Sequence, residues 1–280
     1  MQAVSAREAA RRAGLEVDVV FAENNAIVQI HQIFARIHAP EAERPAVIIM
    51  QSVAGEGLER VARNAVGCGI GWILLNRRVG YVDDLRQLRE DLPISSVTPD
   101  QAEIGRIHGR QARALMKGLG TGLLLYLQGP PDTSAAQDRL QGTQDVLRET
   151  GWPWKILNGD WTEASGDTAM SGWLRLKTSG GQKPALLIAQ NDAMAVGARR
   201  AALRFDASWR QVPVIGCDGF PDAGQRLVNS GELAATVVLP LTAGPAVELA
   251  ARWLAKGQKP SAETVLAGSS YPPEGQLTRR

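Results

Sequence analysis

Short apolar runs alternate with helix-like segments along the whole chain, and this alternation limits the possible folds more than any other feature. The run at residues 46–50 (AVIIM) is followed by Leu58, Val61 and Ala65, whose spacing is that of one helix face. Runs this short and this apolar are typical of parallel strands that are covered on both faces. We predict strands at residues 17–22, 46–50, 72–75, 94–97, 122–128, 154–157, 184–189, 212–216 and 234–238. The pattern predicts an α/β fold with parallel sheets flanked by helices.

The order of elements at the start of the chain is unusual. The first predicted element is a helix at residues 2–13, which Gly14 ends. A helix that opens a parallel α/β domain normally follows a strand. The fold is therefore predicted to lack its first strand, either because the sequence starts late or because the first lobe is built without it.

Polar side chains stand directly after the predicted strands. Gln51 follows residues 46–50, and Asn76 with Arg77 follows residues 72–75. Later strands are followed by Trp161, Asn191 and Asp218. The carboxyl ends of parallel strands lie along one edge of a sheet, where open α/β folds bind ligands. We therefore predict that these side chains line a binding cleft.

Length and charge favour a two-lobed protein with a small ligand. A chain of 280 residues can form two lobes, each with its own core. The net charge of +2 comes from interspersed charges, which disfavours nucleic acid or a membrane surface as partner. No apolar stretch approaches the ~18 residues of a membrane-spanning helix. Arg7, Arg11 and Arg12 interrupt any leader-like apolar core at the start, so we expect a cytosolic protein or one whose leader was removed.

The sequence favours no catalytic, metal or cofactor motif. Residues 67–71 (GCGIG) superficially match a dinucleotide loop, but they precede a predicted strand and lack the third glycine. Asp192 and Asp218 could be read as a carboxylate pair for glycoside hydrolysis, but N-capping of a helix explains Asp192 more simply. We expect no enzyme activity and no cofactor. We also expect packing or surface roles for the three histidines, and buried free thiols for the two cysteines: His31, His38, His108, Cys68 and Cys217.

Five segments in register resemble the type I periplasmic sugar-binding proteins, the ribose-binding-protein-like group that shares its fold with the sensor domains of LacI-type repressors. They are residues 73–77 (ILLNR), 127–139 (LQG followed by TSAAQDR), 189–198 (AQNDAMAVGA), 214–222 (VIGCDGFPD) and 231–236 (GELAAT). The resemblance implies two Rossmann-like lobes joined by a three-segment hinge. It places residues 1–100 plus 240–268 in the N-terminal lobe and residues 101–239 plus 269–280 in the C-terminal lobe.

The resemblance also implies roles for individual residues. Arg77 and Arg139 would donate to ligand hydroxyls, Asp218 would accept from paired hydroxyls, and Asn191 would do both. Trp161 stands where the family places an aromatic residue on the sugar ring. Helix capping is the alternative for Asn191 and Asp218, and an exposed helical charge is the alternative for Arg139.

Three departures from the family pattern bear on the ligand. Asn76 stands where sugar binders of this family usually have Asp, Gln51 where they often have Asn, and Leu239 where Gln is common. An amide in place of a carboxylate leaves two arginines facing one aspartate, which predicts excess positive charge. Gln51 and Asn76 complete the predicted ligand-binding set. We expect a ligand other than plain ribose: a modified, acidic or differently configured sugar, or a polyol.

These observations predict a solute-binding protein that traps a small sugar-like ligand between two lobes and delivers it to an ABC-type permease. Such a protein would be monomeric, and periplasmic or otherwise extracytoplasmic once a leader is removed. The alternative is the ligand-sensing domain of a LacI-type transcriptional regulator, which would be dimeric and cytoplasmic. No basic, DNA-reading segment precedes residue 14, so no nucleic-acid contact is expected through this chain.

Overall fold

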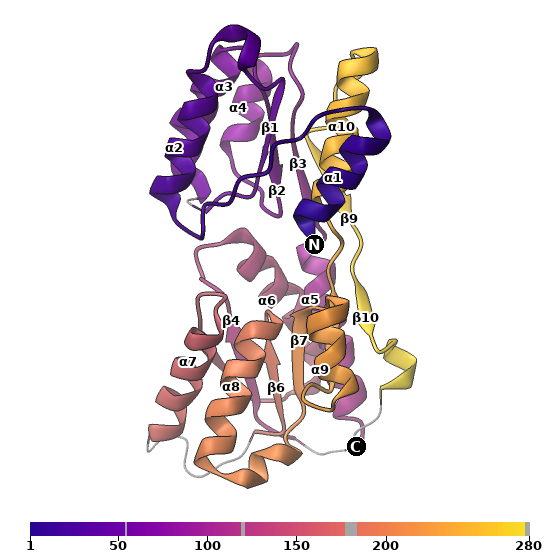
Figure 1. The fold of residues 1–280 in the computed structure, drawn as a ribbon. Helices are drawn as coiled ribbons and strands as arrows, with labels where there is room; N and C mark the ends of the chain where they lie inside the picture. Colours follow the sequence, from indigo (N-terminus) through magenta and orange to yellow (C-terminus); the bar gives the residue numbers. More distant parts are fainter. Residues whose placement is uncertain (54, 119–120, 177–183, 278–280) are drawn as a thin grey trace. The chain divides into compact units, whose positions relative to one another are not determined.

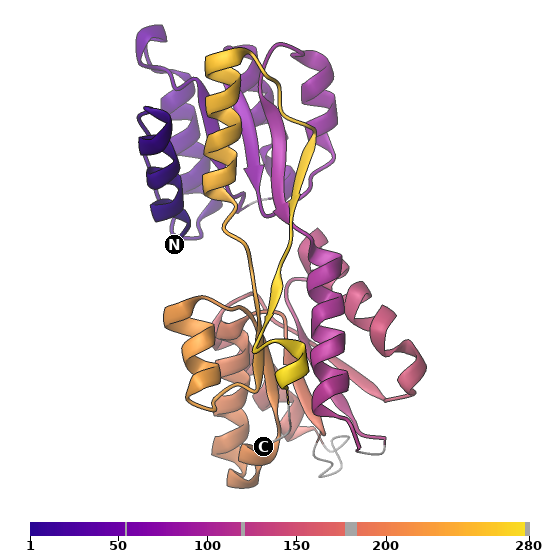
Figure 2. The same ribbon diagram turned by 90° about the vertical axis from the view of Figure 1, so that its right-hand side faces the viewer.

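The structure, a computed structural model, describes residues 1–53, 55–118, 121–176 and 184–277. Its contacts divide the chain into two units, drawn from two directions in Figures 1 and 2. Unit 1 consists of Met1–Pro99 and Pro240–Leu266, and unit 2 of Asp100–Leu239 and Ala267–Arg280. The chain thus passes between the units three times. The last three residues of the predicted 269–280 segment lie outside the described residues.

Unit 1 is built on a four-stranded parallel sheet in the order β1-β2-β3-β9. Its strands are β1 (Val47–Met50), β2 (Gly71–Leu75), β3 (Ile94–Pro99) and β9 (Glu263–Leu266). Its helices are α1 (Gln2–Ala13), α2 (Ala26–Ile37), α3 (Glu59–Gly67), α4 (Tyr81–Leu88) and α10 (Ala243–Lys256). Alternate residues of β2 pack on opposite faces, with Trp72 and Leu74 among α2, α3 and α4, and Ile73 and Leu75 among α1 and α10. Figure 1 shows these two helical layers.

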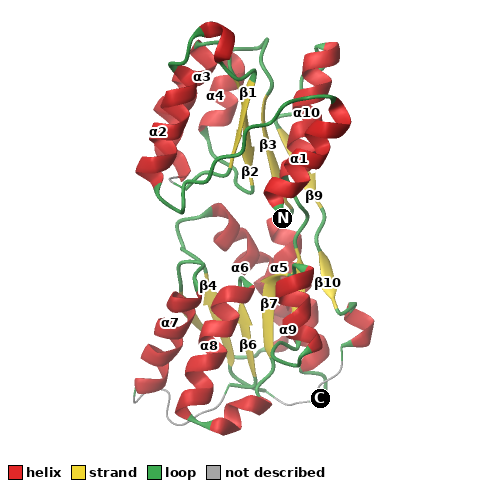
Figure 3. Ribbon diagram, in the orientation of Figure 1, coloured by secondary structure: helices red, strands yellow, loops and turns green. Residues whose placement is uncertain are grey.

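Unit 2 contains a six-stranded sheet in the order β10-β8-β7-β6-β4-β5, parallel except for β10. Its strands are β4 (Leu124–Gln128), β5 (Trp154–Asn158), β6 (Leu186–Ala189), β7 (Val214–Asp218), β8 (Ala235–Val238) and β10 (Ser269–Tyr271). Its helices are α5 (Gln101–Leu115), α6 (Ser134–Leu147), α7 (Glu163–Arg175), α8 (Asp192–Phe205) and α9 (Arg226–Asn229). Tyr126 and Ile188 pack under α5 and α6, whereas Leu127 and Ala189 pack under α7, α8 and α9. Figure 3 shows the strands between the helices.

Local sequence signals account for the ends of these helices. Asp100 accepts a hydrogen bond from the Glu103 amide at 2.8 Å and so caps the start of α5. Gly14 and Gly257 end α1 and α10 in the left-handed conformation, with φ of 66° and 64°. The predicted α/β fold with helix-flanked parallel sheets is confirmed, as is the helix at residues 2–13. No strand precedes that helix in the part of the chain that the structure describes.

The predicted strand at residues 17–22 is wrong. These residues form an irregular connection between α1 and α2 (Figure 1), and in the described residues the sheet ends at β1. Without a strand partner the run remains accessible, with Val20 53% and Phe21 62% exposed. The Phe21 carbonyl accepts instead from Gln32 Nε2 at 2.8 Å. A side chain has thus taken the place of a strand partner at this carbonyl.

The expectation for the cysteines is half right. Cys217 is fully buried and Cys68 is exposed, and both are free thiols. Cys68 directly follows α3 as its C-cap, and its amide donates to the Asn64 and Ala65 carbonyls. A residue that ends a surface helix lies outside the sheet and helix faces that form the core, so its side chain meets solvent.

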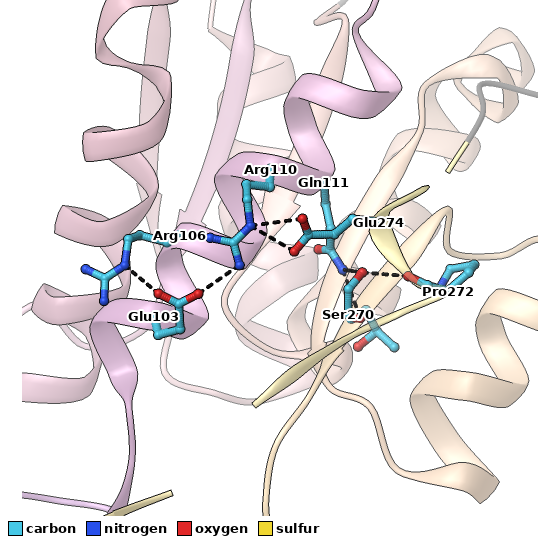
Figure 4. Close-up of polar contacts among 8 residues, drawn as sticks. Glu103, Arg106, Arg110, Gln111, Ser270, Pro272 and Glu274 are labelled. Carbon is cyan, nitrogen blue, oxygen red and sulfur yellow. Dashed lines mark hydrogen bonds and ion pairs between the residues drawn. The ribbon is translucent and has the colours of Figure 1, made fainter. Parts of the chain in front are cut away.

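The segment after the last crossing is fastened to α5 by a polar cluster (Figure 4). Arg110 Nε donates to both carboxylate oxygens of Glu274 at 2.9 Å, and Arg110 Nη2 donates to Glu103 at 2.8 Å. Gln111 Nε2 donates to Ser270 Oγ at 3.0 Å. β10 and the turn after it are thereby held against α5.

None of the described helices is long and apolar enough to cross a membrane.

Candidate functional site

The predicted ligand-binding residues lie at the carboxyl ends of strands or on the helix that follows one. In unit 1, Gln51 follows β1, and Asn76 with Arg77 follows β2. In unit 2, Trp161 lies between β5 and α7, Asn191 between β6 and α8, Asp218 at the end of β7, and Arg139 on α6. Each unit therefore carries polar groups along one edge of its own sheet.

Three of these residues have a backbone that L-amino acids rarely adopt. The φ angles are 64° at Asn76, 73° at Trp161 and 113° at Asp218. Asparagine tolerates the left-handed region, but a bulky residue such as tryptophan is strained there. Strained backbone is concentrated at functional sites, where the surrounding structure holds the side chain in a required direction. The backbone therefore marks strand ends of both units as candidate sites.

In unit 1, Asn76 is the centre of a chain of hydrogen bonds. Its Nδ2 donates to Gln51 Oε1 at 3.0 Å, and its Oδ1 accepts from Thr242 Oγ1 at 2.9 Å. Gln2 Oε1 in turn accepts from the Thr242 and Ala243 amides at the start of α10, both at 3.0 Å. An amide can donate and accept at the same time, whereas an ionised carboxylate only accepts. This is a physical reason for Asn rather than Asp at position 76. Arg77, next in the chain, is half-buried.

In unit 2, Arg139 is a buried cation with neutral hydrogen-bond partners. Arg139 is only 5% exposed, so the alternative of an exposed helical charge is wrong. Its Nε donates to Gln101 Oε1 at 2.8 Å, and its Nη1 donates to the Gln190 carbonyl at 2.6 Å. Among the described residues, Nη2 makes no hydrogen bond. The guanidinium therefore retains donors that a further group could use.

The Trp161 indole lies beside Arg139 and against the loop after β4. The Arg139 guanidinium carbon is 5.6 Å from the centre of the Trp161 ring, within range of a cation–π contact. Gly129 lies directly under the indole, and a Cβ there would come within 2.2 Å of Trp161 Cζ2. Glycine at this position is therefore required for the observed placement of the ring.

Asn191 caps α8 and also holds the residue that carries the indole. Its Oδ1 accepts from the Met194 amide at 2.9 Å, and its Nδ2 donates to the Trp161 carbonyl at 2.8 Å. The capping alternative is therefore the observed geometry for Asn191. It does not hold for Asp218, because Phe220 is the N-cap residue of the following turn and no side chain caps it.

Asp218 is half-buried, and its carboxylate makes no hydrogen bond to the residues described. Burial raises the pKa of Asp218 to about 7; the charge of Arg139 opposes the shift and that of Asp192 adds to it. A carboxylate that lacks internal donors in such a place can accept hydrogen bonds from a bound molecule. Asp218, Arg139 and the Trp161 ring thus combine an acceptor, donors and an apolar face.

Asp192 has a structural role that differs from the predicted one. Asn191, not Asp192, is the N-cap, and the Asp192 carboxylate lies against β7, where a Cβ at Gly216 would come within 2.1 Å of its Oδ1. It accepts from the Gly219 amide at 2.9 Å and from Thr236 Oγ1 at 2.8 Å, joining α8 to β7 and β8. Burial raises the pKa of Asp192 to about 6, although these hydrogen bonds oppose the shift. The sequence alone could not reveal this role, because the partners Gly219 and Thr236 are distant from Asp192 in the chain.

Sequence reasoning did not single out Gln101, and it placed Gln190 after a strand at the ligand-binding edge of the sheet without giving it a role. Gln190 Oε1 accepts from the Gly129 amide at 2.9 Å, and its Nε2 donates to Tyr126 Oη at 2.9 Å and to the Ala136 carbonyl at 2.8 Å. Its side chain thereby fixes the loop under the indole, while its carbonyl fixes Arg139. The available signal was an uncharged polar residue at a strand end directly before Asn191.

Among the described residues, no three His, Cys, Asp or Glu side chains are grouped to hold a metal ion.

Comparison with known proteins identifies the family and the fold of this chain. A family model described as "Periplasmic binding protein domain" matches residues 2–258. A ribose import binding protein of Escherichia coli is 34% identical over 181 residues, which are 64% of this chain and 58% of that protein. The chain thus matches less than two thirds of the length of this relative.

Two further matches concern the fold and the alternative function. An HTH-type transcriptional regulator of Escherichia coli is 37% identical over 99 residues, 34% of this chain and 28% of that protein. The solved structure of the binding protein of an arabinose ABC transporter from Shewanella, bound to L-arabinofuranose, superposes with a TM-score of 0.80 at 24% identity. That superposition covers 98% of this chain and 88% of the Shewanella chain, and at this identity it shows the fold.

Proposed function

Because this chain belongs to the periplasmic binding protein family, we propose that it is a solute-binding protein for a small carbohydrate-like ligand. The ligand would be held by side chains at strand ends and delivered to an ABC-type permease. Binding would occur in the periplasm and without catalysis. The chain would act as a monomer with no cofactor.

The observation that carries this proposal is the grouping of Arg139, Trp161 and Asp218 in unit 2. A sugar presents hydroxyls, which donate and accept, and ring faces that are weakly apolar. Arg139 Nη2 offers donors, the Asp218 carboxylate offers acceptors, and the indole offers a flat apolar surface. The strained backbone at Trp161 and Asp218 supports a binding role for both.

The charges of the candidate residues favour a ligand other than plain ribose. The Asn76 amide is already used by Gln51 and Thr242, so unit 1 has an amide and Arg77 at the end of β2 rather than a carboxylate. Asp218 has a raised pKa, which lowers the negative charge available to balance Arg139 near neutral pH. We propose an acidic or otherwise modified sugar, or a polyol, as the ligand class.

Calorimetric titration tests both levels of the proposal. The panel contains D-ribose, L-arabinose, xylitol, myo-inositol and the sugar acids D-ribonate and D-galacturonate. Micromolar or tighter binding of at least one member supports the function, and a preference for a sugar acid or polyol supports the ligand class. Tight binding of ribose alone overturns the ligand class, and no binding by any member counts against the function.

The alternative function is that of the ligand-sensing domain of a LacI-type regulator. The partial match to the Escherichia coli regulator supports this alternative. The two functions differ in the genes that accompany them. Permease and ATPase genes beside this reading frame, with an apolar leader, support transport. A helix-turn-helix encoded in frame before Met1 supports regulation.

A further inference from the structure

Two of the three nitrogen atoms of the Arg139 guanidinium are fixed by protein groups. Nε donates to Gln101 Oε1 at 2.8 Å, and Nη1 donates to the Gln190 carbonyl at 2.6 Å. Both hydrogen bonds are buried, because Gln101 is 7% exposed and Gln190 is 0% exposed. One acceptor comes from the first residue of α5 and the other from the chain directly after β6. Together they leave Nη2 as the guanidinium nitrogen that has no partner among the described residues.

Gln101 can reach Arg139 because α5 and α6 are in direct main-chain contact. A Cβ at Gly105 would lie 2.1 Å from the Arg139 carbonyl oxygen, and a Cβ at Gly142 would lie 2.0 Å from the Ala102 carbonyl oxygen. Each helix thus contributes a glycine where the other helix's backbone touches it. The two glycines therefore permit the close approach of α5 and α6 that brings Gln101 within hydrogen-bond distance of Arg139.

The contact with Trp161 cannot orient the guanidinium by itself. At 5.6 Å from the ring centre, the guanidinium carbon is near the outer limit of a cation–π contact, and such a contact is weakly directional. A hydrogen bond donated by Nε, in contrast, fixes the plane of the guanidinium and the direction of both terminal nitrogens. The orientation therefore depends on Gln101 and on the Gln190 carbonyl.

We propose that Gln101 is a positioning residue, which orients Arg139 so that Nη2 faces the bound ligand. This proposal rests on the proposed function for the identity of what Nη2 contacts. A neutral acceptor suits the role, because a carboxylate at position 101 would pair with the guanidinium and compete with ligand oxygens. Gln101 is also the second residue of unit 2 after the first crossing of the chain. The orientation of the Arg139 guanidinium therefore depends on the position of the first turn of α5.

Exchange of the Arg139 Nε proton with water, measured by NMR on 15N-labelled protein, tests the positioning role without any ligand. The signal is assigned as the one missing from the Arg139→Lys variant. A buried Hε that donates to Gln101 exchanges slowly in the wild type. In Gln101→Ala we expect roughly tenfold or faster exchange, the factor for losing one hydrogen bond to a charged group. Gln101→Glu keeps an acceptor and should keep the slow exchange.

Gln111→Ala is the matched control, because Gln111 is also a buried glutamine of α5 but donates to the Thr236 carbonyl and Ser270 Oγ. It loses a comparable side chain and should leave Arg139 Hε exchange unchanged. The proposal is overturned if the wild-type Arg139 Hε exchanges as fast as exposed arginines do, or if Gln101→Ala leaves its exchange unchanged. It is also overturned if Gln111→Ala speeds that exchange as much as Gln101→Ala does.

Titration of the same variants with the sugar panel separates this inference from the proposed function. If a panel member binds the wild type, Gln101→Ala should weaken its binding at least tenfold and Gln111→Ala should not. Unchanged affinity of Gln101→Ala overturns the positioning role in binding. If no panel member binds the wild type, the proposed function fails while the exchange measurement still decides whether Gln101 orients Arg139.

Discussion

The Arg139 guanidinium carbon lies 5.6 Å from the centre of the Trp161 ring, and this pair is the core of the candidate site in unit 2. The two residues come from different elements, and each is held by other groups of unit 2. Gln101 and the Gln190 carbonyl hold Arg139, whereas Gly129 and Asn191 hold Trp161. Both side chains are therefore oriented by contacts within the protein, and such preorganisation lowers the entropic cost of binding.

Substitution of Gly129 by alanine should displace the Trp161 ring. The added Cβ would approach Trp161 Cζ2 to 2.2 Å, so the indole must move. We expect a loss of about 1–3 kcal/mol in the free energy of unfolding and a changed tryptophan emission spectrum. Gly172→Ala is the control, because it lies on α7 with nothing within 4 Å of its Cβ position. That variant should be neutral or slightly more stable, and equal behaviour of the two variants would refute the contact.

The raised pKa of Asp218 predicts that the free energy of unfolding falls as the pH rises towards 7. Its pKa rises from 3.8 to about 7 in the folded protein, so the folded state holds a proton that the unfolded state has lost between these values. The stabilisation from this proton is complete below about pH 4 and is lost as the pH rises through about 7. Urea unfolding at pH 5 and pH 8 should show a smaller loss of stability in Asp218→Asn than in the wild type. Each pH unit corresponds to about 1.4 kcal/mol, and two units separate pH 5 from the pKa of about 7, so the two losses should differ by an amount on the order of 2–3 kcal/mol.

Asp192→Asn gives the comparison for this pH dependence. The pKa of Asp192 is raised in the same direction, to about 6, so its stabilisation is lost over a lower pH range. Its carboxylate also accepts from Gly219 and Thr236, and an amide can keep one acceptor only. We therefore expect Asp192→Asn to be less stable than the wild type at pH 7. Identical pH profiles of the wild type and Asp218→Asn would contradict the assignment to Asp218.

Replacement of Asn76 by aspartate should remove one hydrogen bond of this side chain and keep the other. Aspartate can still accept from Thr242 Oγ1, but it cannot donate to Gln51 Oε1. Both residue types tolerate the φ of 64°, so the backbone should not change. We expect a loss of about 1 kcal/mol in the free energy of unfolding, measured by urea titration. Gln51→Ala removes the same hydrogen bond from the other side, and the double variant should lose little more than either single one.

Much of the fold follows from patterns within single segments. The predicted strands at residues 46–50, 72–75 and 212–216 needed only short apolar runs followed by polar residues, and the structure contains β1, β2 and β7 there. The run at residues 17–22 has the same pattern but no strand beside it in the described sheet. A strand requires a partner, and an apolar run does not reveal whether one is available.

The parts of the site that the sequence did not predict depend on contacts between distant residues. Arg139 was predicted as a ligand-binding residue, but its hydrogen bond to Gln101 was not, because that bond forms only where α5 packs against α6. The carboxylate of Asp192 looks like a cap until β8 places Thr236 beside it. Trp161, in contrast, was predictable from its position after a strand, although its φ of 73° was not.

A crystal structure of the protein with the tightest-binding member of the sugar panel is the decisive test of the site in unit 2. We expect the ligand ring to pack on the Trp161 indole, with ligand oxygens hydrogen-bonded to Arg139 Nη2 and to the Asp218 carboxylate. A ligand bound elsewhere, with Arg139 Nη2 and Asp218 making no contact to it, would show that this grouping is not the binding site.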